Sequence, residues 1–204
     1  MKIDYSLYLC TDRNLTADIE KAVELAINGG VTVVQLREKN CTSREFFEVG
    51  KSLKKITDSK NIPLIVNDRL DIAQAIDAAG VHVGQTDLPC KVARKIWGAE
   101  KIIGVSVSTV EEAVQAEIDG ANYLGVGAMF ATNTKTDAKL VTLDTLKKIR
   151  AAVKIPIVAI GGINLETISK IKPAKIDGVA VVSAIIAAEN PEIAAKNLLK
   201  VWRN

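Results

Sequence analysis

The sequence predicts an α/β protein in which residues 1–204 fold as a single (β/α)8 barrel, the TIM-barrel architecture. Eight short apolar runs alternate with longer segments that have a helical period. Most of the runs are β-branched and continuously apolar, which is typical of parallel strands buried on both faces. Proline opens two runs, at Pro63 and Pro156, and glycine opens two others, at Gly80 and Gly178. The two prolines and the two glycines are separated by similar numbers of residues, which favours two related half-barrels. Any βα array can also reuse proline and glycine in this way.

The eight predicted strands are rich in valine, isoleucine and leucine. They are Tyr5–Thr11, Val31–Leu36, Pro63–Asn67, Gly80–Val83, Lys101–Val105, Tyr123–Val126, Pro156–Ile160 and Gly178–Val182. No linker or low-complexity tract separates them, so we expect one catalytic domain. An open flavodoxin-like or Rossmann sheet is the alternative fold. No predicted strand is followed by the GxGxxG pattern of dinucleotide-binding sheets, which counts against the Rossmann version.

Between the strands, apolar residues recur with the period of amphipathic helices. The predicted helices are Leu15–Asn28, Ser43–Asp58, Arg69–Ala79, Leu88–Trp97, Thr109–Gly120 and Val141–Val153. Thr109, with Glu112 three residues later, forms a capping-box signature at the start of one helix. Glycine follows four helical segments, where we expect a positive φ to end the helix. These glycines are Gly29, Gly80, Gly120 and Gly178.

The composition excludes two classes of protein. The net charge of +3 is scattered along the chain and aromatic residues make up 4% of it, which argues against binding to nucleic acid. The longest apolar run, Val179–Ala188, is shorter than the roughly 20 residues that cross a bilayer, so we expect no membrane association. Both a monomer and a homo-oligomer remain open.

The cysteines and the amino terminus indicate a cytoplasmic protein. Cys10, Cys41 and Cys90 are widely spaced and form no CxxC pair, so a zinc site is not expected. An odd number of thiols fits a reducing compartment. Asp4 and Tyr5 stand where a secretion signal would begin its apolar stretch.

Polar residues follow the second predicted strand, where a barrel would place its active site. Because side chains alternate along a strand, Val33, Gln35 and Arg37 share the inner face, with Lys39 close behind. We therefore expect these polar side chains at the mouth of the barrel. The alternative is a surface loop at residues 37–39, which leaves Gln35 unexplained inside an apolar strand.

Two carboxylates follow neighbouring strands. Asn67 and Asp68 end the third strand, and Asp87 comes shortly after the fourth. A pair of carboxylates at adjacent strand ends is well placed to share one Mg²⁺, which is commonly held by one or two carboxylates, water and substrate phosphates. The alternative is that each aspartate caps the helix that follows it.

Two more strand residues carry polar groups toward the interior. His82, the only histidine in the chain, is out of phase with Val81 and Val83 and therefore faces the inside of the barrel. A single histidine there is expected to be a core residue with satisfied hydrogen bonds rather than a catalytic acid or base. Ser106 follows at the end of the fifth strand.

The last two strands indicate a phosphate site, which barrels often form at this position. Glycines leave backbone N–H groups open, and a helix N-terminus favours an anion. Each of these strands is predicted to run into a helix. The expected cradle comprises Gly161, Gly162, Val182 and Ser183. The alternative is a pair of tight turns without a ligand.

The loop between residues 126 and 141 supplies hydroxyl groups and a cation, at Thr132, Thr134 and Lys135. Together with Arg37 and Lys39, these groups suit a substrate with more negative charge than one phosphate. A diphosphate with Mg²⁺ at the mouth and a second phosphate at the cradle point to displacement of a diphosphate leaving group. The expected partners are therefore small anionic substrates.

The motifs QLREK, PLIVNDR, GVHVGQTD, GVS, YLGVG, FATNTKTDA, AIGGI and GVAVVSAI occur in this order between residues 35 and 185. In this combination the chain resembles the thiamine-phosphate synthase family. The resemblance implies that 4-amino-2-methyl-5-(diphosphooxymethyl)pyrimidine and 4-methyl-5-(2-phosphooxyethyl)thiazole condense to thiamine phosphate and diphosphate. It also implies a Mg²⁺-assisted, dissociative displacement.

The resemblance implies a role for each motif residue. The pyrimidine diphosphate would contact Gln35, Arg37, Lys39, Asn67, Ser106 and Lys135, of which Arg37, Lys39, Ser106 and Lys135 would be catalytic. Asp68 and Asp87 would hold Mg²⁺. The thiazole phosphate would contact Thr132, Thr134, Gly162, Val182 and Ser183. The chain departs from the family at Ala131, where the family has proline, and we expect a more mobile loop in the free protein.

Three other functions remain open from the sequence. A thiazole tautomerase-like paralogue would need neither the aspartate pair nor Lys135. Another barrel acting on a phosphorylated sugar would need a proton-transfer residue at a strand end. A non-catalytic sensor of thiamine precursors would bind them without turnover.

Overall fold

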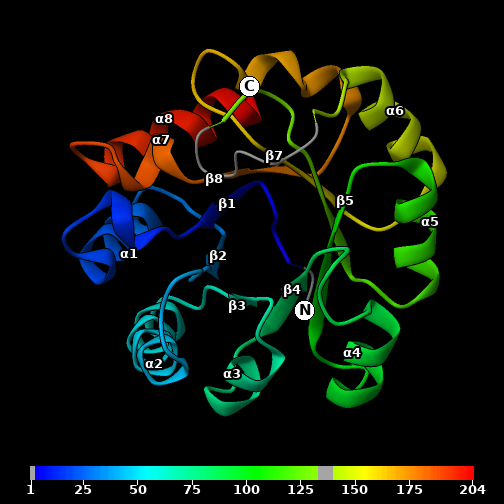
Figure 1. The fold of residues 1–204 in the computed structure, drawn as a ribbon. Helices are drawn as coiled ribbons and strands as arrows, with labels where there is room; N and C mark the ends of the chain where they lie inside the picture. Colours follow the sequence, from blue (N-terminus) through cyan, green and yellow to red (C-terminus); the bar gives the residue numbers. More distant parts are fainter. Residues whose placement is uncertain (1–2, 133–139) are drawn as a thin grey trace.

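The computed structural model describes residues 3–132 and 140–204. Within these residues eight parallel strands pair in sequence order and close into a barrel (Figure 1). The strands are β1 (Leu7–Cys10), β2 (Val33–Leu36), β3 (Leu64–Asn67), β4 (Gly80–Val83), β5 (Ile102–Val107), β6 (Tyr123–Val126), β7 (Ile157–Ile160) and β8 (Gly178–Val181). The predicted (β/α)8 barrel is confirmed, and the open flavodoxin-like or Rossmann sheet is wrong.

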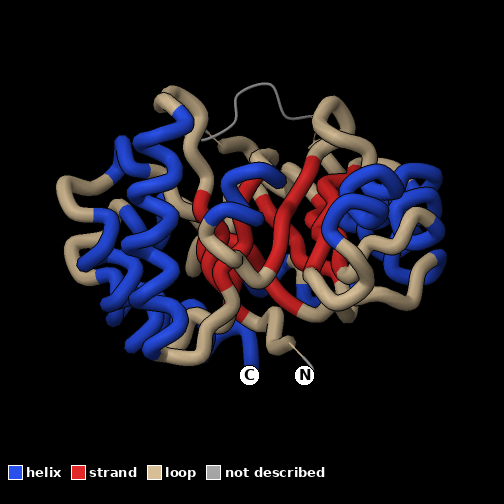
Figure 2. The backbone as a smooth tube through the Cα atoms, turned by 90° about the horizontal axis from the view of Figure 1, so that it is seen from below, coloured by secondary structure: helices blue, strands red, loops and turns tan. Residues whose placement is uncertain are grey.

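The helices surround the strands, and both chain ends lie at the same end of the barrel (Figure 2). They are α1 (Ile19–Asn28), α2 (Ser43–Ser59), α3 (Leu70–Ala75), α4 (Cys90–Trp97), α5 (Val110–Ile118), α6 (Leu143–Ala152), α7 (Ser183–Ile186) and α8 (Pro191–Arg203). Three 3-10 turns occur at η1 (Arg13–Leu15), η2 (Ile168–Lys170) and η3 (Lys172–Ala174). Across the described residues, no helix is long and apolar enough to span a membrane.

Side-chain caps mark the start of several helices, among them α1 and α5. The helix predicted from Leu15 starts at Ile19, because the Asp18 side chain accepts a hydrogen bond from the backbone N–H of Lys21. The capping box of Thr109 and Glu112 at the start of α5 is confirmed. The segment after β7 forms the turns η2 and η3 where an α-helix was predicted, so that prediction is wrong.

Glycine has a different role from the predicted one at two strand starts. Gly80 and Gly178 open β4 and β8 and are not among the described glycines with positive φ. A Cβ atom on Gly178 would lie 1.7 Å from a backbone oxygen of the segment before β1, so close chain approach requires glycine there. Gly120 has the predicted positive φ, at 93°. Gly29 has φ −76°, and its neighbour Gly30 has the positive value, 105°.

Side chains of the strands divide into an outer and an inner set. Val34 and Leu36 point outward and join the main core between strands and helices. Val33 points inward and packs with Tyr8 and Tyr123 in a second cluster inside the barrel. The alternation predicted for β2 is therefore confirmed. It places Gln35, which is 4% exposed, inside the barrel.

Arg94 of α4 ties the helix to the next two strands. Its guanidinium donates hydrogen bonds to the carbonyl oxygens of Gly98 and Lys101, at 2.7 Å each, and of Gly120, at 2.8 Å.

Replacing Arg94 with methionine should lower the free energy of unfolding by about 3 kcal/mol, because these carbonyls lose a charged donor. Urea denaturation measures the change, with exposed Lys91→Met as the control; equal stability of the two variants would contradict it.

Candidate active site

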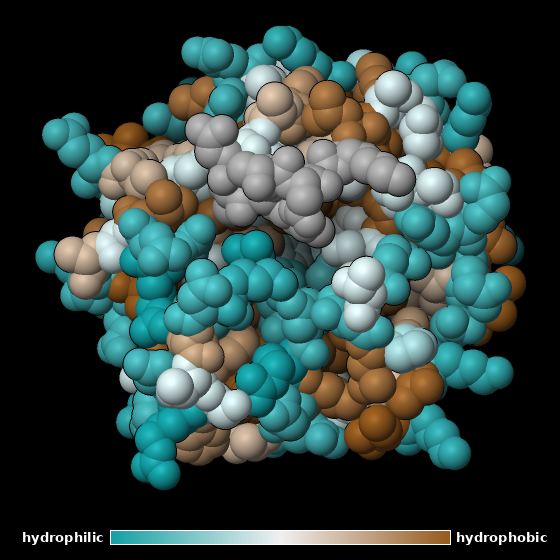
Figure 3. All heavy atoms as spheres, in the orientation of Figure 1, coloured by the Kyte–Doolittle hydropathy of each residue, from teal (hydrophilic) through white to brown (hydrophobic). Residues whose placement is uncertain are grey.

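The carboxyl ends of the strands gather most of the predicted polar side chains on one face. Figure 3 shows hydrophilic side chains over the middle of this face. Gln35 lies at the end of β2, where its Nε2 donates to the hydroxyl of Tyr8 at 2.9 Å. The backbone N–H of Arg37 donates to Oγ1 of Thr11 at 3.0 Å, which joins the ends of β1 and β2. These contacts fix the start of the loop that carries Arg37 and Lys39.

Lys39 reaches the aspartate that follows β3. Its Nζ lies 2.7 Å from Oδ2 of Asp68. The Asp68 backbone is left-handed, with φ 62°, and its N–H donates to the carbonyl oxygen of His82 at 2.8 Å. Aspartate tolerates this region better than most residues, and the turn directs the carboxyl toward the neighbouring strand end. Asn67, the last residue of β3, is half-buried beside it.

Asp87 is held by the loop after β4. Its Oδ2 accepts from the backbone N–H of Gly84 at 2.8 Å. The helices that follow the two aspartates begin after Arg69 and Pro89, and neither start has a side-chain cap. The helix-cap alternative is therefore wrong for both Asp68 and Asp87.

The carboxyl group of Asp87 lies close enough to that of Asp68 to affect its pKa. Burial raises the pKa of Asp68, the adjacent carboxyl of Asp87 raises it further, and the Lys39 ammonium opposes both effects. A divalent cation between the carboxylates would relieve this repulsion, so the pair fits a Mg²⁺ site. In the part of the chain that the structure describes, no group of three or more acidic, histidine or cysteine side chains could hold a metal. Water and substrate oxygens would have to complete the coordination.

Ser106 lies opposite Gln35 in the interior of the barrel mouth. Its Oγ is 2.8 Å from Nε2 of His82, and its carbonyl oxygen accepts from Nε2 of Gln85 at 2.8 Å. His82 is 7% exposed and hydrogen-bonded, as predicted for a histidine inside the barrel. Its Nδ1 lies 2.8 Å from the hydroxyl of Tyr123.

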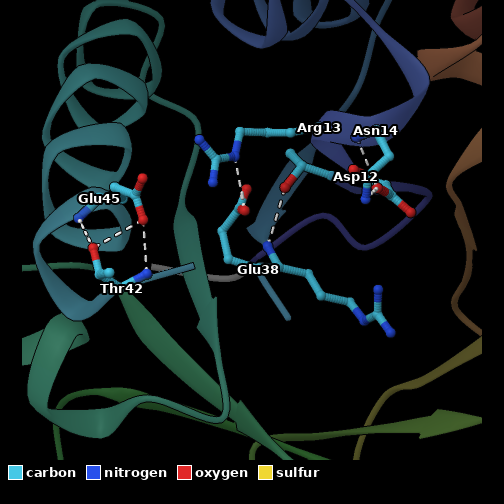
Figure 4. Close-up of polar contacts among 8 residues, drawn as sticks. Asp12, Arg13, Asn14, Glu38, Thr42 and Glu45 are labelled. Atoms are coloured by element: carbon cyan, nitrogen blue, oxygen red, sulfur yellow. Dashed lines mark hydrogen bonds and ion pairs between the residues drawn. The ribbon is translucent and has the colours of Figure 1, made fainter. Parts of the chain in front are cut away.

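A polar cavity of about 330 Å³ lies between the loops after β1 and β2. Arg13 and Glu38 line it and form an ion pair, with Nε 2.8 Å from Oε2 (Figure 4). Burial raises the pKa of Glu38, and the Arg13 guanidinium opposes the shift. The pair braces the segment between Arg37 and Lys39, which also line the cavity.

Sequence reasoning missed the pair of Arg13 and Glu38. The two residues are 25 positions apart, and Glu38 was treated as part of the loop between two cations. The signal available in the sequence was an acidic residue within an otherwise basic QLREK segment. Its partner could be identified only from the three-dimensional arrangement.

The turn after β7 meets the loop after β6. Gly161 and Gly162 have φ 99° and 64°, and a Cβ atom on Gly162 would lie 2.7 Å from the carbonyl oxygen of Ala131. The backbone N–H of Phe130 donates to the carbonyl oxygen of Gly161 at 3.0 Å. The start of the loop that leads to Thr132 is therefore hydrogen-bonded to the predicted phosphate cradle. Thr132 is half-buried there.

Val182 and Ser183, the remaining predicted phosphate contacts, lie at the start of α7. Val182 precedes the helix without a side-chain cap, and its carbonyl oxygen accepts from the backbone N–H of Ile186 at 2.9 Å. Ser183, the first helical residue, is exposed. The strands β7 and β8 are paired, so these residues and Gly162 lie at adjacent strand ends. Thr134 and Lys135 lie outside the described residues.

Comparisons with known proteins agree with this arrangement. A profile of the family described as thiamine monophosphate synthase matches residues 7–185. The chain is 57% identical to the thiamine-phosphate synthase of Clostridium beijerinckii over 199 residues, which cover 97% of this chain and 95% of the relative. It is 55% identical to that of Ruminiclostridium cellulolyticum over 205 residues, which cover 100% and 98%.

Solved structures show the same barrel. The thiamine phosphate pyrophosphorylase from Pyrococcus furiosus superimposes with a TM-score of 0.91 at 42% identity, covering 98% of this chain and 96% of that one. A 3-hexulose-6-phosphate synthase superimposes with a TM-score of 0.71 at 18% identity, covering 96% and 99%. The second likeness concerns the fold alone.

Proposed function

The chain belongs to the thiamine-phosphate synthase family, whose members are transferases, and we propose that Asp68 and Asp87 hold the Mg²⁺ that assists its reaction. The reaction joins the diphosphooxymethyl pyrimidine to the phosphooxyethyl thiazole and releases diphosphate. The observation that carries the proposal is the mutual placement of the two carboxyls, with Lys39 2.7 Å from Asp68. Residues 1–204 act as one catalytic domain in this proposal.

The cationic side chains would bind the leaving group. Arg37, Lys39 and Lys135 supply positive charge for the diphosphate oxygens, and bound Mg²⁺ would neutralise further charge as the diphosphate departs. The bond between the exocyclic carbon and the diphosphate oxygen breaks, and its electron pair leaves with the diphosphate. Electrostatic stabilisation of that charge would supply most of the rate enhancement.

The remaining site residues would orient the two reactants. Gln35, Asn67 and Ser106 would hold the pyrimidine over the mouth of the barrel. The thiazole phosphate would lie at Thr132, Thr134, Gly162, Val182 and Ser183. The thiazole nitrogen then donates its lone pair to the exocyclic carbon and becomes the positively charged thiazolium nitrogen. This step moves no proton and so needs no catalytic histidine. The only histidine in the sequence, His82, is buried inside the barrel.

A turnover assay tests the proposed reaction. Protein, both substrates and Mg²⁺ are mixed, and thiamine phosphate is measured as its fluorescent oxidation product together with released diphosphate. We expect the two products in a 1:1 ratio and loss of turnover when EDTA removes the metal.

The alternatives give different results in the same assay. A sensor would bind the precursors without forming product. A tautomerase-like paralogue would change the thiazole phosphate alone and would be insensitive to EDTA. Either result from folded protein would overturn the proposed function.

A further inference from the structure

A chain of hydrogen bonds, buried except at its partly buried Ser106 end, crosses the inside of the barrel and joins two predicted pyrimidine contacts. Nε2 of Gln35 donates to the Tyr8 hydroxyl at 2.9 Å, and the Tyr8 and Tyr123 hydroxyls are 2.7 Å apart. Tyr123 is 2.8 Å from Nδ1 of His82, and Nε2 of His82 is 2.8 Å from Oγ of Ser106. We call these five side chains the interior relay.

The direction of each hydrogen bond in the interior relay follows from the first one. Because the amide nitrogen of Gln35 can only donate, the Tyr8 oxygen accepts from it. Tyr8 is 1% exposed and its own proton needs an acceptor, which the Tyr123 hydroxyl supplies at 2.7 Å. Tyr123 then donates to Nδ1 of His82. A neutral imidazole that accepts at Nδ1 carries its proton at Nε2, so His82 donates to the Ser106 oxygen.

The hydroxyls of Tyr8 and Tyr123 must stay protonated to donate in the interior relay, and their burial favours this. Burial raises the pKa of Tyr8 well above its usual value, and the neighbouring Tyr123 adds to the shift. Burial likewise raises the pKa of Tyr123. Both hydroxyls therefore keep their protons throughout the neutral pH range.

Glycines on β5 and β6 make room for the two central rings. A Cβ atom on Gly104 would lie 2.2 Å from Cζ of Tyr123. A Cβ atom on Gly125 would lie 3.0 Å from Cε1 of His82. The ring centroids of Tyr123 and His82 are 5.4 Å apart. A residue larger than glycine at position 104 or 125 would take up the space that these rings occupy.

From this geometry we infer that His82 and Tyr123 are positioning residues, which hold Ser106 as a hydrogen-bond donor toward the pyrimidine diphosphate. With its oxygen occupied by His82, the Ser106 hydroxyl directs its proton to an acceptor atom of the substrate. The same chain holds the Gln35 amide in one orientation on the opposite wall. His82 itself transfers no proton. The inference rests on the proposed function for its substrate, but the relay can be measured without it.

Nitrogen NMR tests the relay directly, because the chain contains a single histidine. A long-range proton–nitrogen spectrum of the untagged, nitrogen-15-labelled protein reports which ring nitrogen carries the proton. We expect the neutral form with the proton on Nε2. In Tyr123→Phe, Nδ1 should lose its donor, and its resonance should move toward that of an unbonded imidazole nitrogen. A proton on Nδ1, or on both nitrogens, in the unmodified protein would overturn the inference.

Tyr5→Phe is the matched control for Tyr123→Phe. The ring of Tyr5 packs on that of Tyr123, with centroids 4.9 Å apart, but its hydroxyl is not part of the relay. Tyr5→Phe also removes one tyrosine hydroxyl from the cluster inside the barrel. We expect it to leave the histidine spectrum unchanged.

Kinetics test the positioning role. Tyr123→Phe should lower kcat/KM by about tenfold, the scale of one hydrogen bond, while Tyr5→Phe leaves it unchanged. Ser106→Ala should cost a smaller factor in the Tyr123→Phe protein than in the unmodified or Tyr5→Phe protein, because the hydroxyl is then no longer oriented. The same factor in all three proteins would contradict the inference. The expected spectrum without any turnover would leave the relay intact and overturn the proposed function instead.

Discussion

Asp87→Asn is expected to lower the turnover rate by about 10²-fold or more, the scale of a lost electrostatic group in a transition state. The asparagine can still accept from the N–H of Gly84, as the aspartate does at 2.8 Å, so the loop after β4 keeps its shape. The negative charge that would bind Mg²⁺ is removed. Steady-state assays over a range of Mg²⁺ concentrations should therefore show a lower rate and a higher requirement for the metal.

Asp68→Asn is expected to have a similar effect. Asparagine tolerates the left-handed backbone of Asp68, φ 62°, whereas alanine would add strain unrelated to the metal. Asp71→Asn is the matched control: this nearby, exposed carboxylate pairs with Arg69, 2.6 Å away, outside the site. If all three variants kept the original rate and metal requirement, the aspartate pair would not be the metal site.

Lys39→Met is expected to lower both the turnover rate and the Mg²⁺ concentration that the reaction requires. Lys39 is 2.7 Å from Asp68 in the free protein, so its ammonium competes with a metal for that carboxylate. Removing it should lower the turnover rate by about 10²-fold, because a cation that binds the diphosphate is lost. It should also lower the Mg²⁺ concentration that gives half of the maximal rate.

A matched cation elsewhere in the chain controls for charge. Lys51 of α2 pairs with Glu48 at 3.8 Å, so Lys51→Met removes one charge from a surface ion pair outside the mouth. We expect neither its rate nor its metal requirement to change. A higher Mg²⁺ requirement in Lys39→Met would mean that Lys39 and the metal do not compete for Asp68.

The strands were predictable because their chemistry is local. A short, continuously apolar run such as Ile157–Ile160 has few other structures open to it in an α/β chain. Alternation within β2 was enough to place Gln35 inside the barrel and Leu36 outside. The capping box at Thr109 was likewise contained in four consecutive residues.

The missed features depend on residues far apart in the sequence. Tyr8 and Tyr123, 115 positions apart, look like ordinary strand residues until the barrel brings their hydroxyls together. Gly178 was expected to end a helix, but it is needed because β8 passes very close to the segment before β1. Neither feature has a local pattern, so no sequence period could identify it.

A metal-binding titration shows whether Asp68 and Asp87 hold a divalent metal together with the diphosphate, as we propose. Mn²⁺, whose free form is quantified by electron paramagnetic resonance, stands in for Mg²⁺ in a titration of the protein with and without inorganic diphosphate. Protein that contains both Asp68→Asn and Asp87→Asn serves as the comparison. We expect Mn²⁺ binding that is strengthened by diphosphate and lost in the double variant. Equal Mn²⁺ binding by the two proteins in the presence of diphosphate would contradict it.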